Sequence, residues 1–509
     1  MAPSLRATNL MQTLIDGPYS LVKIPTITFK ESDISIDTLS VFDHVRPIGI
    51  SPGYSKSGIL IALAIADDQN CRIVEFNRDT APRRLEGGGQ GRGGSRQPIR
   101  HDTEGLRLLQ DVVLCRQAGD LFAFDMGPLS MSLYCDTKLR VTNAVDIQSG
   151  ISAVDRKPIT AIVEVVGSSV PVMKENIKTV FRNPVYDQED RNRATDLAMR
   201  AWVSQFLAGY ENGAETFAKV PKVDTKKFSP QVLDIIAKIA NDAHRLDQMK
   251  PTQTIHRVSV MTDNTTGENY VRSNTFKDRV RWDKEVRLSV DGSAGNYIVP
   301  GQIGGVTGKD AALSTIRSLS GKSIGSTLIS IGRDDPTTAE AQRAATVLRI
   351  LQGNTQLLDN SPWIKNIWFP DDDLNLFWPE EWSLPASPPY NSQSSNDSVK
   401  SPPSSPMVLQ PLNPSQQEAV NTMYSPEDAH RITIIQGPPG TGKTSVIAAY
   451  VQLAIEDGSN GIWLVAQSNV AVKNIAEKLM KVGFLDWKLL VSRDFHFQWY
   501  VYILWDLFL

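Results

Sequence analysis

The sequence predicts an α/β protein of several domains, and three observations lead to this fold class. Strand-like and helix-like patterns alternate through residues 1–225, as they do in domains that combine helices with a sheet. Residues 226–383 mix strand-like stretches with one well-capped helix, which indicates an α+β region. The apolar run at 432–435 is followed by a glycine-rich loop and a helical pattern, an order typical of parallel sheets. A chain of 509 residues has room for about three such domains.

Composition and charge exclude several classes of protein. The chain has 53 Lys and Arg residues and 56 Asp and Glu residues, a net charge of -3, which excludes a uniformly basic nucleic-acid coat protein. Its three cysteines are too few for a disulfide framework, which favours a reducing compartment. The N-terminus lacks the apolar core of a signal peptide, and no run approaches the roughly 18 apolar residues of a membrane span. We therefore expect a protein of the cytoplasm or nucleus with no membrane partner.

The first domain, residues 1–225, is defined by its apolar strands. Residues 58–66 and 71–76 are largely apolar and predict two adjacent strands joined by the polar turn at 67–70. Helical patterns follow at three places, 105–115, near Leu129 and 192–207. Residues 83–100 are rich in Gly and Arg, and the entropy that glycine loses on ordering predicts a flexible loop there.

The middle region and the segment after it carry no recognisable chemistry. Strand-like stretches occur in the middle region at 256–262, 286–290 and 326–331. Its clearest helix begins after Thr337, which stands three residues before Glu340 as in a capping box, and runs to about Gln352. Residues 384–407 are rich in Ser, Pro and Asn with few apolar side chains, so we expect a disordered linker. The role of residues 226–383 stays open.

The strongest chemical signal is the sequence GPPGTGKT, a full match to GxxxxGK followed by Ser or Thr, in the required strand, loop and helix context. Its glycines allow successive backbone N–H groups to turn toward phosphates, and the following helix adds its positive N-terminal dipole. Lys443 reaches the β- and γ-phosphates, and the Thr444 hydroxyl is a ligand for Mg²⁺. The pattern therefore predicts a site for ATP with Mg²⁺ that is made by Gly437, Pro438, Pro439, Gly440, Thr441, Gly442, Lys443 and Thr444.

Two flanking segments extend this motif into a family resemblance. The stretch LNPSQQEAV at 412–420 precedes the glycine-rich loop, and WLVAQSNVAV at 463–472 follows it. The first segment resembles the Q motif of superfamily 1 helicases, and the second resembles motif Ia. The segment between them, IIQGPPGTGKT at 434–444, resembles motif I. The subclass they resemble is 1B, of the nonsense-mediated-decay type.

The resemblance implies a fold and roles for single residues. It implies a RecA-like lobe over residues 408–498, in which Gln416 recognises the adenine of ATP, because a carboxamide both donates and accepts hydrogen bonds. It also implies that Ser468 and Asn469 contact the backbone of a single strand, in a way that reads no sequence. The implied partner is therefore single-stranded RNA or DNA, and protein partners stay unknown.

The resemblance stops after the third motif. About 65 residues follow Lys443, and they include no Asp-Glu pair at the end of a strand to hold Mg²⁺ and orient the attacking water. Residues 499–509 are apolar and aromatic without a polar face, where the family has further sheet and helix. We therefore expect a truncated, partial lobe. The alternatives to an ATP-dependent helicase are an ATP- or nucleic-acid-binding protein without hydrolysis and a P-loop ATPase outside the helicases.

Residues 1–225 are also distantly similar to the RNase H-like fold of 3'-5' exonucleases of the RNase D type. The strand pair at 58–76 stands where that family has its second and third strands. Phe124-Asp125 resembles its second acidic motif, and Asp196 near the start of a helix resembles its last.

The first acidic motif of that family is absent, because Ser51-Pro52-Gly53 stands in its place. Hydrolysis with two metal ions needs four carboxylates around the scissile phosphate. We therefore expect a degenerate nuclease domain that binds nucleic acid or a partner, with a working 3'-5' exonuclease as the second alternative. For Asp125, Asp146 and Asp196, roles as helix caps and loop acids are the competing interpretation.

Overall fold

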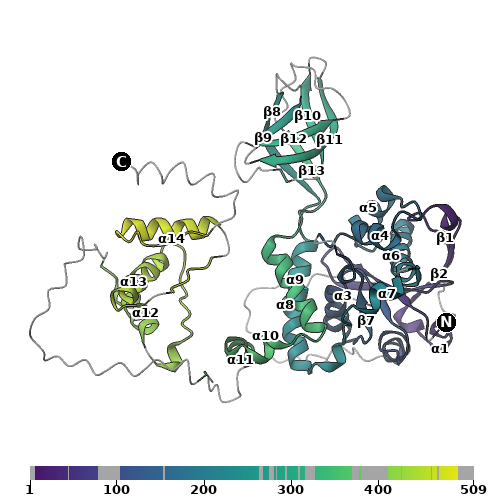
Figure 1. Ribbon diagram of the computed structural model, residues 1–509, viewed down its shortest axis with the longest axis horizontal. Helices are drawn as coiled ribbons and strands as arrows, with labels where there is room; N and C mark the ends of the chain where they lie inside the picture. The colour runs from purple at the N-terminus through teal and green to yellow at the C-terminus, as the bar shows by residue number, and fades with distance from the viewer. Residues whose placement is uncertain are drawn as a thin grey trace, which may run out of the picture. The chain divides into compact units, whose positions relative to one another are not determined.

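The computed structural model divides the chain into two compact units, residues 1–359 and 360–509, and each is described by itself (Figure 1). The described residues are 6–43, 45–77, 104–152, 155–211, 213–262, 268–273, 280–281, 284–292, 295–307, 310–315, 327–369, 378–379, 411–425, 427–459, 461–466 and 469–490. The predicted loop at 83–100, linker at 384–407 and tail at 499–509 lie outside them.

A seven-stranded mixed sheet forms the core of the larger unit. Its strands are β1 (Arg6–Met11), β2 (Lys23–Lys30), β3 (Ile48–Tyr54), β4 (Leu60–Ala66), β5 (Cys71–Glu75), β6 (Leu121–Ala123) and β7 (Ala144–Asp146). Their order across the sheet is β1-β2-β5-β4-β3-β6-β7. Strands β3, β4 and β5 form an antiparallel meander, whereas β6 and β7 continue from β3 in parallel. Every residue of β4 and β5 is buried, which confirms the two adjacent apolar strands that the sequence predicts.

Helices lie between and after these strands. They are α1 (Ile36–Leu39), α2 (Glu104–Leu109), α3 (Met126–Ser132), α4 (Pro158–Val166), α5 (Lys174–Arg182), α6 (Arg191–Gly209), α7 (Gly213–Ala218) and α8 (Pro230–Gln248). The three predicted helical patterns correspond to α2, α3 and α6 and are confirmed. Helix α4 is not among the predicted helices, because its sequence PITAIVEVV is rich in β-branched residues of low helix propensity. Its buried face packs into the apolar core, and this tertiary packing overrides the propensity.

Helix α6 packs closely on β3 and β4. Gly49 in β3 permits the approach, because a Cβ added there would lie 2.0 Å from the carbonyl oxygen of Ala201 and 2.5 Å from the backbone nitrogen of Gln205. Ala198 carries a small side chain and Trp202 a large one, and both side chains are buried. The position of α6 on the sheet therefore depends on a strand residue without a side chain.

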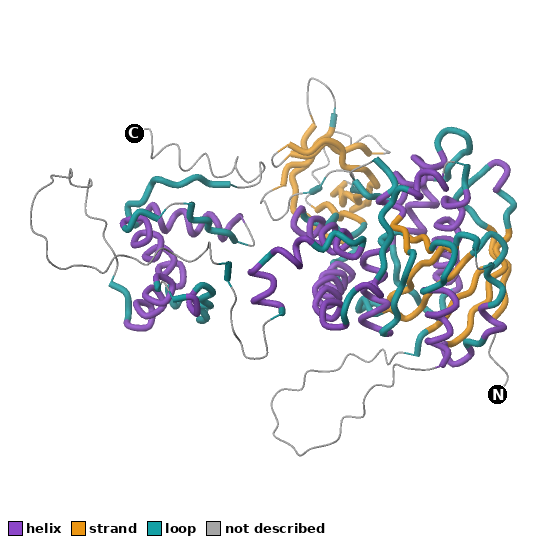
Figure 2. The backbone as a smooth tube through the Cα atoms, turned by 60° about the horizontal axis from the view of Figure 1, so that its bottom comes forward, coloured by secondary structure: helices purple, strands orange, loops and turns teal. Residues whose placement is uncertain are grey.

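Residues 253–331 form a closed antiparallel barrel, inserted in the chain between α8 and α9 (Thr338–Leu351), two helices that pack on each other (Figure 2). Its strands are β8 (Gln253–Thr262), β9 (Asn269–Ser273), β10 (Glu285–Gly292), β11 (Gly295–Thr307), β12 (Asp310–Thr315) and β13 (Thr327–Ile331). They close in the order β10-β11-β12-β9-β8-β13 around an aliphatic interior. The strands predicted in the middle region are confirmed as parts of β8, β10 and β13.

The other barrel strands were not predicted, and β11 shows the reason. Pro300 and several glycines interrupt its apolar pattern, and both residue types weaken a strand signal. Its register shifts between Ile303 and Val306, where Gly304 and Gly305 form a bulge-like irregularity. Closure of the barrel is a long-range property that no single strand pattern contains.

The capping box predicted at the start of α9 is present. The Glu340 backbone N–H donates to the Thr337 hydroxyl at 3.3 Å, and the Thr337 backbone N–H donates to the Glu340 carboxylate at 2.7 Å. The helix ends at Leu351, one residue before the predicted end near Gln352.

The regular secondary structure in the described residues of the smaller unit is helical, and loops join the helices. Its helices are α11 (Pro362–Trp368), α12 (Pro414–Tyr424), α13 (Lys443–Glu456) and α14 (Asn469–Lys481), while α10 (Gln356–Asn360) spans the boundary between the units. Helix α13 packs against both α12 and α14. The strand predicted at 432–435 is wrong for this structure, because the segment pairs with no strand among the described residues of 411–490. A strand requires a ladder partner for its backbone groups, and without one Ile434 is 87% exposed.

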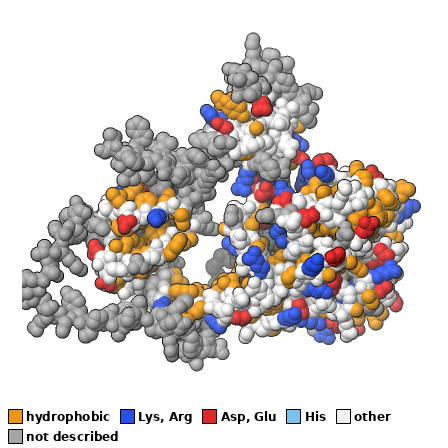
Figure 3. All heavy atoms as spheres, in the orientation of Figure 1, with side chains coloured by type: hydrophobic (Ala, Val, Ile, Leu, Met, Phe, Trp, Pro, Cys, Tyr) orange, Lys and Arg blue, Asp and Glu red, His pale blue; other side chains and the backbone are white. Residues whose placement is uncertain are grey.

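Charge and hydropathy are distributed as in an ordinary globular surface. On the visible face of the larger unit, basic and acidic side chains are interspersed rather than separated (Figure 3). None of the helices in the described part of the chain combines the length and apolar character needed to cross a bilayer.

Gly49→Ala should destabilise the larger unit by about 3 kcal/mol or more, because the new methyl group would overlap the backbone of α6. Thermal unfolding followed by circular dichroism measures the effect as a fall in midpoint of several degrees. Gly305→Ala is the control, since nothing lies within 4 Å of a Cβ added there. Equal midpoints for the two variants would contradict the proposed close approach.

Candidate functional site

The glycine-rich loop predicted to bind phosphate leads directly into α13, which begins at Lys443. Gly440 and Gly442 have φ values of 84° and 80°, in the left-handed region that side chains disfavour. Gly442 is also crowded, because a Cβ added there would lie 2.5 Å from the Gln416 side-chain nitrogen. Both glycines are therefore needed for the conformation of the loop in front of the helix N-terminus.

Lys443 lies over this loop. Its Nζ donates to the carbonyl oxygens of Gly437 at 2.7 Å and Pro438 at 2.9 Å. The Thr441 hydroxyl also donates to the Pro438 carbonyl, at 2.9 Å, which tightens the turn. Thr444 is in the first turn of α13, where its hydroxyl is close to the positive end of the helix dipole. An ammonium, a helix N-terminus and a half-buried hydroxyl at one end of a helix fit a triphosphate with Mg²⁺.

Gln416 of α12 is held beside the loop. Its side-chain nitrogen donates to the Thr441 carbonyl at 2.9 Å, and its side-chain oxygen accepts from the Asn413 backbone N–H at 3.0 Å. Asn413 in turn caps the helix by accepting from the Gln416 backbone N–H at 2.9 Å. A carboxamide has one further hydrogen and one further lone pair. Gln416 can therefore keep both contacts and still bind the edge of a base.

The residues predicted to contact nucleic acid are not placed together with this loop by the described structure. Ser468 lies outside the described residues, and Asn469 is the first residue of α14. Their role stays a prediction.

In the larger unit, an arginine occupies the position of the missing acidic motif. Arg200 of α6 donates through Nε to the Ser51 hydroxyl at 3.1 Å and through Nη2 to the Pro52 carbonyl at 3.3 Å. Its Nη1 donates to the Val180 carbonyl at 2.9 Å. The side chain is buried, and burial lowers the pKa of Arg200 to about 10. A guanidinium that stays charged at neutral pH therefore lies at Ser51 and Pro52 of β3.

Two acids named in the sequence analysis, Asp146 and Asp196, lie next to other groups of the protein. Asp146 is fully buried, and it accepts hydrogen bonds from the Met126 backbone N–H at 3.0 Å and the Ser149 hydroxyl at 2.7 Å. It also pairs with Arg156 at 2.7 Å. Asp196 stands 3.9 Å from Arg193. Asp146, the last residue of β7, therefore has a structural role inside the protein, where it accepts a hydrogen bond from the first residue of α3.

Metal binding by these acids gains no support from the geometry. Within the part of the chain that the structure describes, no three His, Cys, Asp or Glu side chains are grouped so as to hold a metal ion. Asp125 remains, with a left-handed backbone at φ 52° and a carboxyl group that opens into a cavity. The pKa of Asp125 is raised to about 6, mainly by burial and secondly by the negative charge of Asp146.

The cavity beside Asp125 brings together residues that sequence reasoning did not connect. His244, Asp247 and Gln248 come from α8, and Arg333 comes from the segment before α9. These residues are more than 100 positions from Asp125 in the chain and share no motif with it. No signal in a single sequence joins them.

Comparison with known proteins identifies relatives of the smaller unit. A family model described as an AAA domain matches residues 411–491. Regulator of nonsense transcripts 1 of Caenorhabditis elegans is 39% identical over 75 residues, which are 15% of this chain and 7% of that protein. ATP-dependent helicase upf1 of Schizosaccharomyces pombe is 40% identical over 81 residues, 15% of this chain and 8% of that protein.

A third relative is DNA-binding protein SMUBP-2 of Mesocricetus auratus, which is 43% identical over 68 residues, 13% of this chain and 6% of that protein. The chain thus spans less than a tenth of the length of these curated relatives. The resemblance to superfamily 1 helicases of the nonsense-mediated-decay type is confirmed for this segment.

Asp125→Asn should stabilise the larger unit at neutral pH and leave its stability unchanged in acid. A carboxyl group whose pKa is raised from 3.8 to about 6 in the folded state lowers stability as the pH rises between these two values, because the unfolded chain releases the proton first. The gain should therefore be absent well below pH 4, grow between pH 4 and pH 6, and stay constant above pH 6. Because water reaches this carboxyl in the cavity, we expect the free energy of unfolding to rise by about 1 kcal/mol. A pKa shift of two full units without such screening would correspond to ~3 kcal/mol. Asparagine also tolerates the left-handed backbone.

Thermal unfolding midpoints of the wild type and the Asp125→Asn variant at pH 4.5, 6 and 7.5 measure this difference. Asp234→Asn, on the exposed side of α8, is the matched control. A difference that is constant across pH would show that ionisation of Asp125 is not its cause.

Proposed function

We propose that residues 411–491, the segment that belongs with the superfamily 1 helicases of the nonsense-mediated-decay type, bind ATP with Mg²⁺ and act on single-stranded RNA or DNA. The observation that carries the proposal is the position of Lys443 over a loop with two left-handed glycines at the start of α13. The relatives support both nucleic acids, since one is named a regulator of nonsense transcripts and another a DNA-binding protein. Such a protein would act in the cytoplasm or nucleus.

The residues of the loop have distinct tasks in this proposal. Lys443 exchanges its contacts with the Gly437 and Pro438 carbonyls for oxygens of the β- and γ-phosphates, which are stronger acceptors because they are charged. Backbone N–H groups at the start of α13 bind the same phosphates. The Thr444 hydroxyl is a ligand for Mg²⁺, which neutralises the charge that develops on the transferred phosphoryl group. Gln416 binds the adenine edge from α12.

The proposal assigns a different role to the larger unit. Its strand order β5-β4-β3-β6-β7, an antiparallel meander followed by parallel strands, supports an RNase H-like fold. Arg200 at Ser51 and Pro52, and the partners of Asp146, support loss of two-metal chemistry. We propose that this domain is a degenerate nuclease domain that serves binding rather than hydrolysis.

Lys443→Ala should weaken the binding of a fluorescent ATP analogue by at least about tenfold, because the variant loses a charged contact to the phosphates. Titration of the 509-residue chain with the analogue in the presence of Mg²⁺ measures this affinity. Phosphate release with and without poly(U) or oligo(dT) measures the hydrolysis of ATP. Lys481→Ala, at the end of α14, is the control and should leave the affinity unchanged. Tight binding by the Lys443→Ala variant would refute the proposed site.

Gln416→Ala should reduce the preference for ATP over GTP by about tenfold, because a lost hydrogen-bond pair to the base is worth about 1–2 kcal/mol. Competition of ATP and GTP against the fluorescent analogue measures the ratio. Gln417→Ala is the matched control, since the neighbouring side chain bonds to Asn421 within its own helix at 3.1 Å. A preference that survives in the Gln416→Ala variant would place adenine recognition elsewhere.

A further inference from the structure

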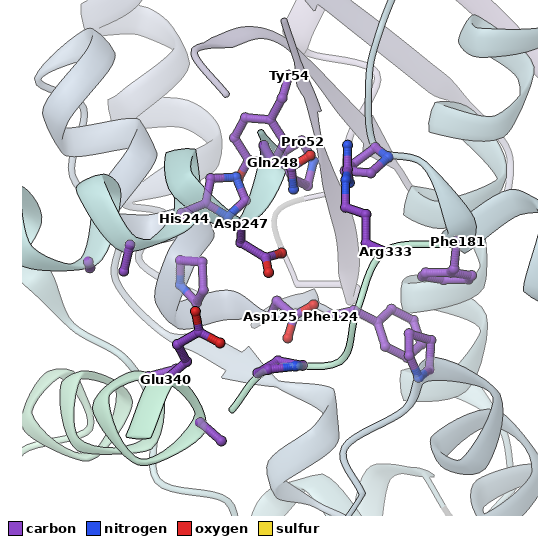
Figure 4. Close-up of a pocket in the computed structure, with 18 of the residues that line it drawn as sticks. Pro52, Tyr54, Phe124, Asp125, Phe181, His244, Asp247, Gln248, Arg333 and Glu340 are labelled. Atoms are coloured by element: carbon purple, nitrogen blue, oxygen red, sulfur yellow. The ribbon is translucent and has the colours of Figure 1, made fainter. Parts of the chain in front are cut away.

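A cavity of about 570 Å³ lies in the larger unit at the end of β3, and α8, α9 and the segment 332–336 close it (Figure 4). Its walls are partly apolar and aromatic. Phe124 and Phe181 meet edge to face, with 4.8 Å between ring centroids, and the ring of Tyr54 lies 4.4 Å from that of His244. The space is large enough for a small organic molecule and is lined by flat rings.

Carboxylates point into this space from different elements. Figure 4 shows Asp125, Asp247 and Glu340 directed toward the middle of the cavity. Lys250 pairs with both Asp247, at 2.9 Å, and Glu340, at 3.1 Å. Asp125 forms no ion pair with any residue that the structure describes, and Arg156, which acts on it electrostatically, is bound to Asp146. Asp125 is therefore the acid that lacks a cation.

None of the arginines that line the cavity forms an ion pair with Asp125 in the described structure. The Arg200 guanidinium donates hydrogen bonds to β3 and to the Val180 carbonyl. Arg182 is bound to Glu285 at 3.1 Å. Arg333 acts electrostatically on Asp247 rather than on Asp125. His244 is neutral at physiological pH, because burial lowers its pKa to about 4.

An independent observation is that polar atoms of cavity-lining residues lack hydrogen-bond partners in the described structure, among them the Gln248 side-chain oxygen, an acceptor, and the Arg333 Nε, a donor. Gln248 is only 8% exposed, and its side-chain oxygen is inaccessible and accepts no hydrogen bond from the described residues. The His244 Nε2 is likewise buried without a partner in the described structure. Buried acceptors without donors are costly, and native proteins satisfy nearly all of them. A ligand with several N–H groups would satisfy the Gln248 oxygen and Asp125 together.

We propose that this cavity binds a compact organic cation with several N–H donors, a guanidinium or amidinium, whose charge is balanced by Asp125 and whose remaining donors reach Gln248. A planar guanidinium suits the site because it offers five N–H donors in one plane and stacks on aromatic rings. The cation is either a free small molecule or the arginine side chain of a peptide. The site is separate from the ATP loop and does not depend on the function proposed for it.

Calorimetric titration of the full-length chain with butylguanidinium and with butylurea tests the proposal. The two probes have nearly the same shape, and only the first is charged. Binding of butylguanidinium with no detectable binding of butylurea is the expected result. Equal binding of both, or binding of neither, would overturn the proposal.

Variants then locate the site. Asp125→Asn should weaken butylguanidinium binding at least tenfold, and Gln248→Met, which removes the acceptor at similar volume, should weaken it by about threefold. Asp234→Asn on the exposed side of α8 should have no effect. The thermal unfolding of each variant shows that it is folded. Unchanged affinity in the Asp125→Asn variant would place the cation outside this cavity and overturn the proposal.

Two competitors complete the test. Displacement of butylguanidinium by the tripeptide acetyl-Gly-Arg-Gly-amide would identify an arginine side chain as the ligand, whereas binding of the free cation alone would identify a small molecule. Uridine and adenosine monophosphates test the other chemistry that a former nuclease cleft could retain. If these nucleotides bind and butylguanidinium does not, the cavity is a nucleotide site and the proposal is wrong.

Discussion

The larger unit depends on the close approach of α6 to β3, which only a strand residue without a side chain permits. At Gly49 the backbone of the helix occupies the volume that any other residue would need for its Cβ. This approach carries Arg200 to the middle of β3, where its guanidinium binds the Ser51 hydroxyl and the Pro52 carbonyl. The same contact that builds the core therefore also determines which charge lies at this part of the sheet.

The two acids Asp125 and Asp146 differ in how their charge is balanced within the protein. In a metal-dependent nuclease, several carboxylates share their charge with bound metal ions. Here Asp146 has Arg156 and the N-terminus of α3 as partners, so its charge is satisfied within the protein. Asp125 forms no ion pair with a described residue, and burial, followed by the charge of Asp146, raises its pKa to about 6. In this cleft Asp125 lies with aromatic rings and with buried polar atoms that have no partner in the described structure.

Local features were predictable from the sequence, and features that depend on distant residues were not. The capping box of Thr337 and Glu340, the buried strands β4 and β5 and the start of α13 each depend on a few neighbouring residues, and the structure confirms them. The barrel itself was not predicted; three of its strands were, whereas β11 was missed because Pro300 and its glycines weaken the apolar pattern. The strand expected at 432–435 is unpaired, since a ladder needs a second chain segment that the apolar pattern does not specify. The cavity combines β3, α8 and the segment before α9, and no spacing in the sequence links them.

The ATP loop illustrates why a short motif can predict a site that a whole domain pattern cannot. The loop and the N-terminus of the helix lie within eight consecutive residues. Gly440 and Gly442 turn the backbone, and Lys443 is the first residue of α13. Without phosphate, the Lys443 ammonium binds two neutral carbonyl oxygens, which are weaker acceptors than a charged phosphate oxygen. In the proposed ATP site, exchange of these contacts for phosphate oxygens would favour the bound state. Gln416 is the one long-range element, and it is fixed in place by Asn413 and Thr441 before any base arrives. A loop that is ordered before binding loses less entropy when the ligand enters.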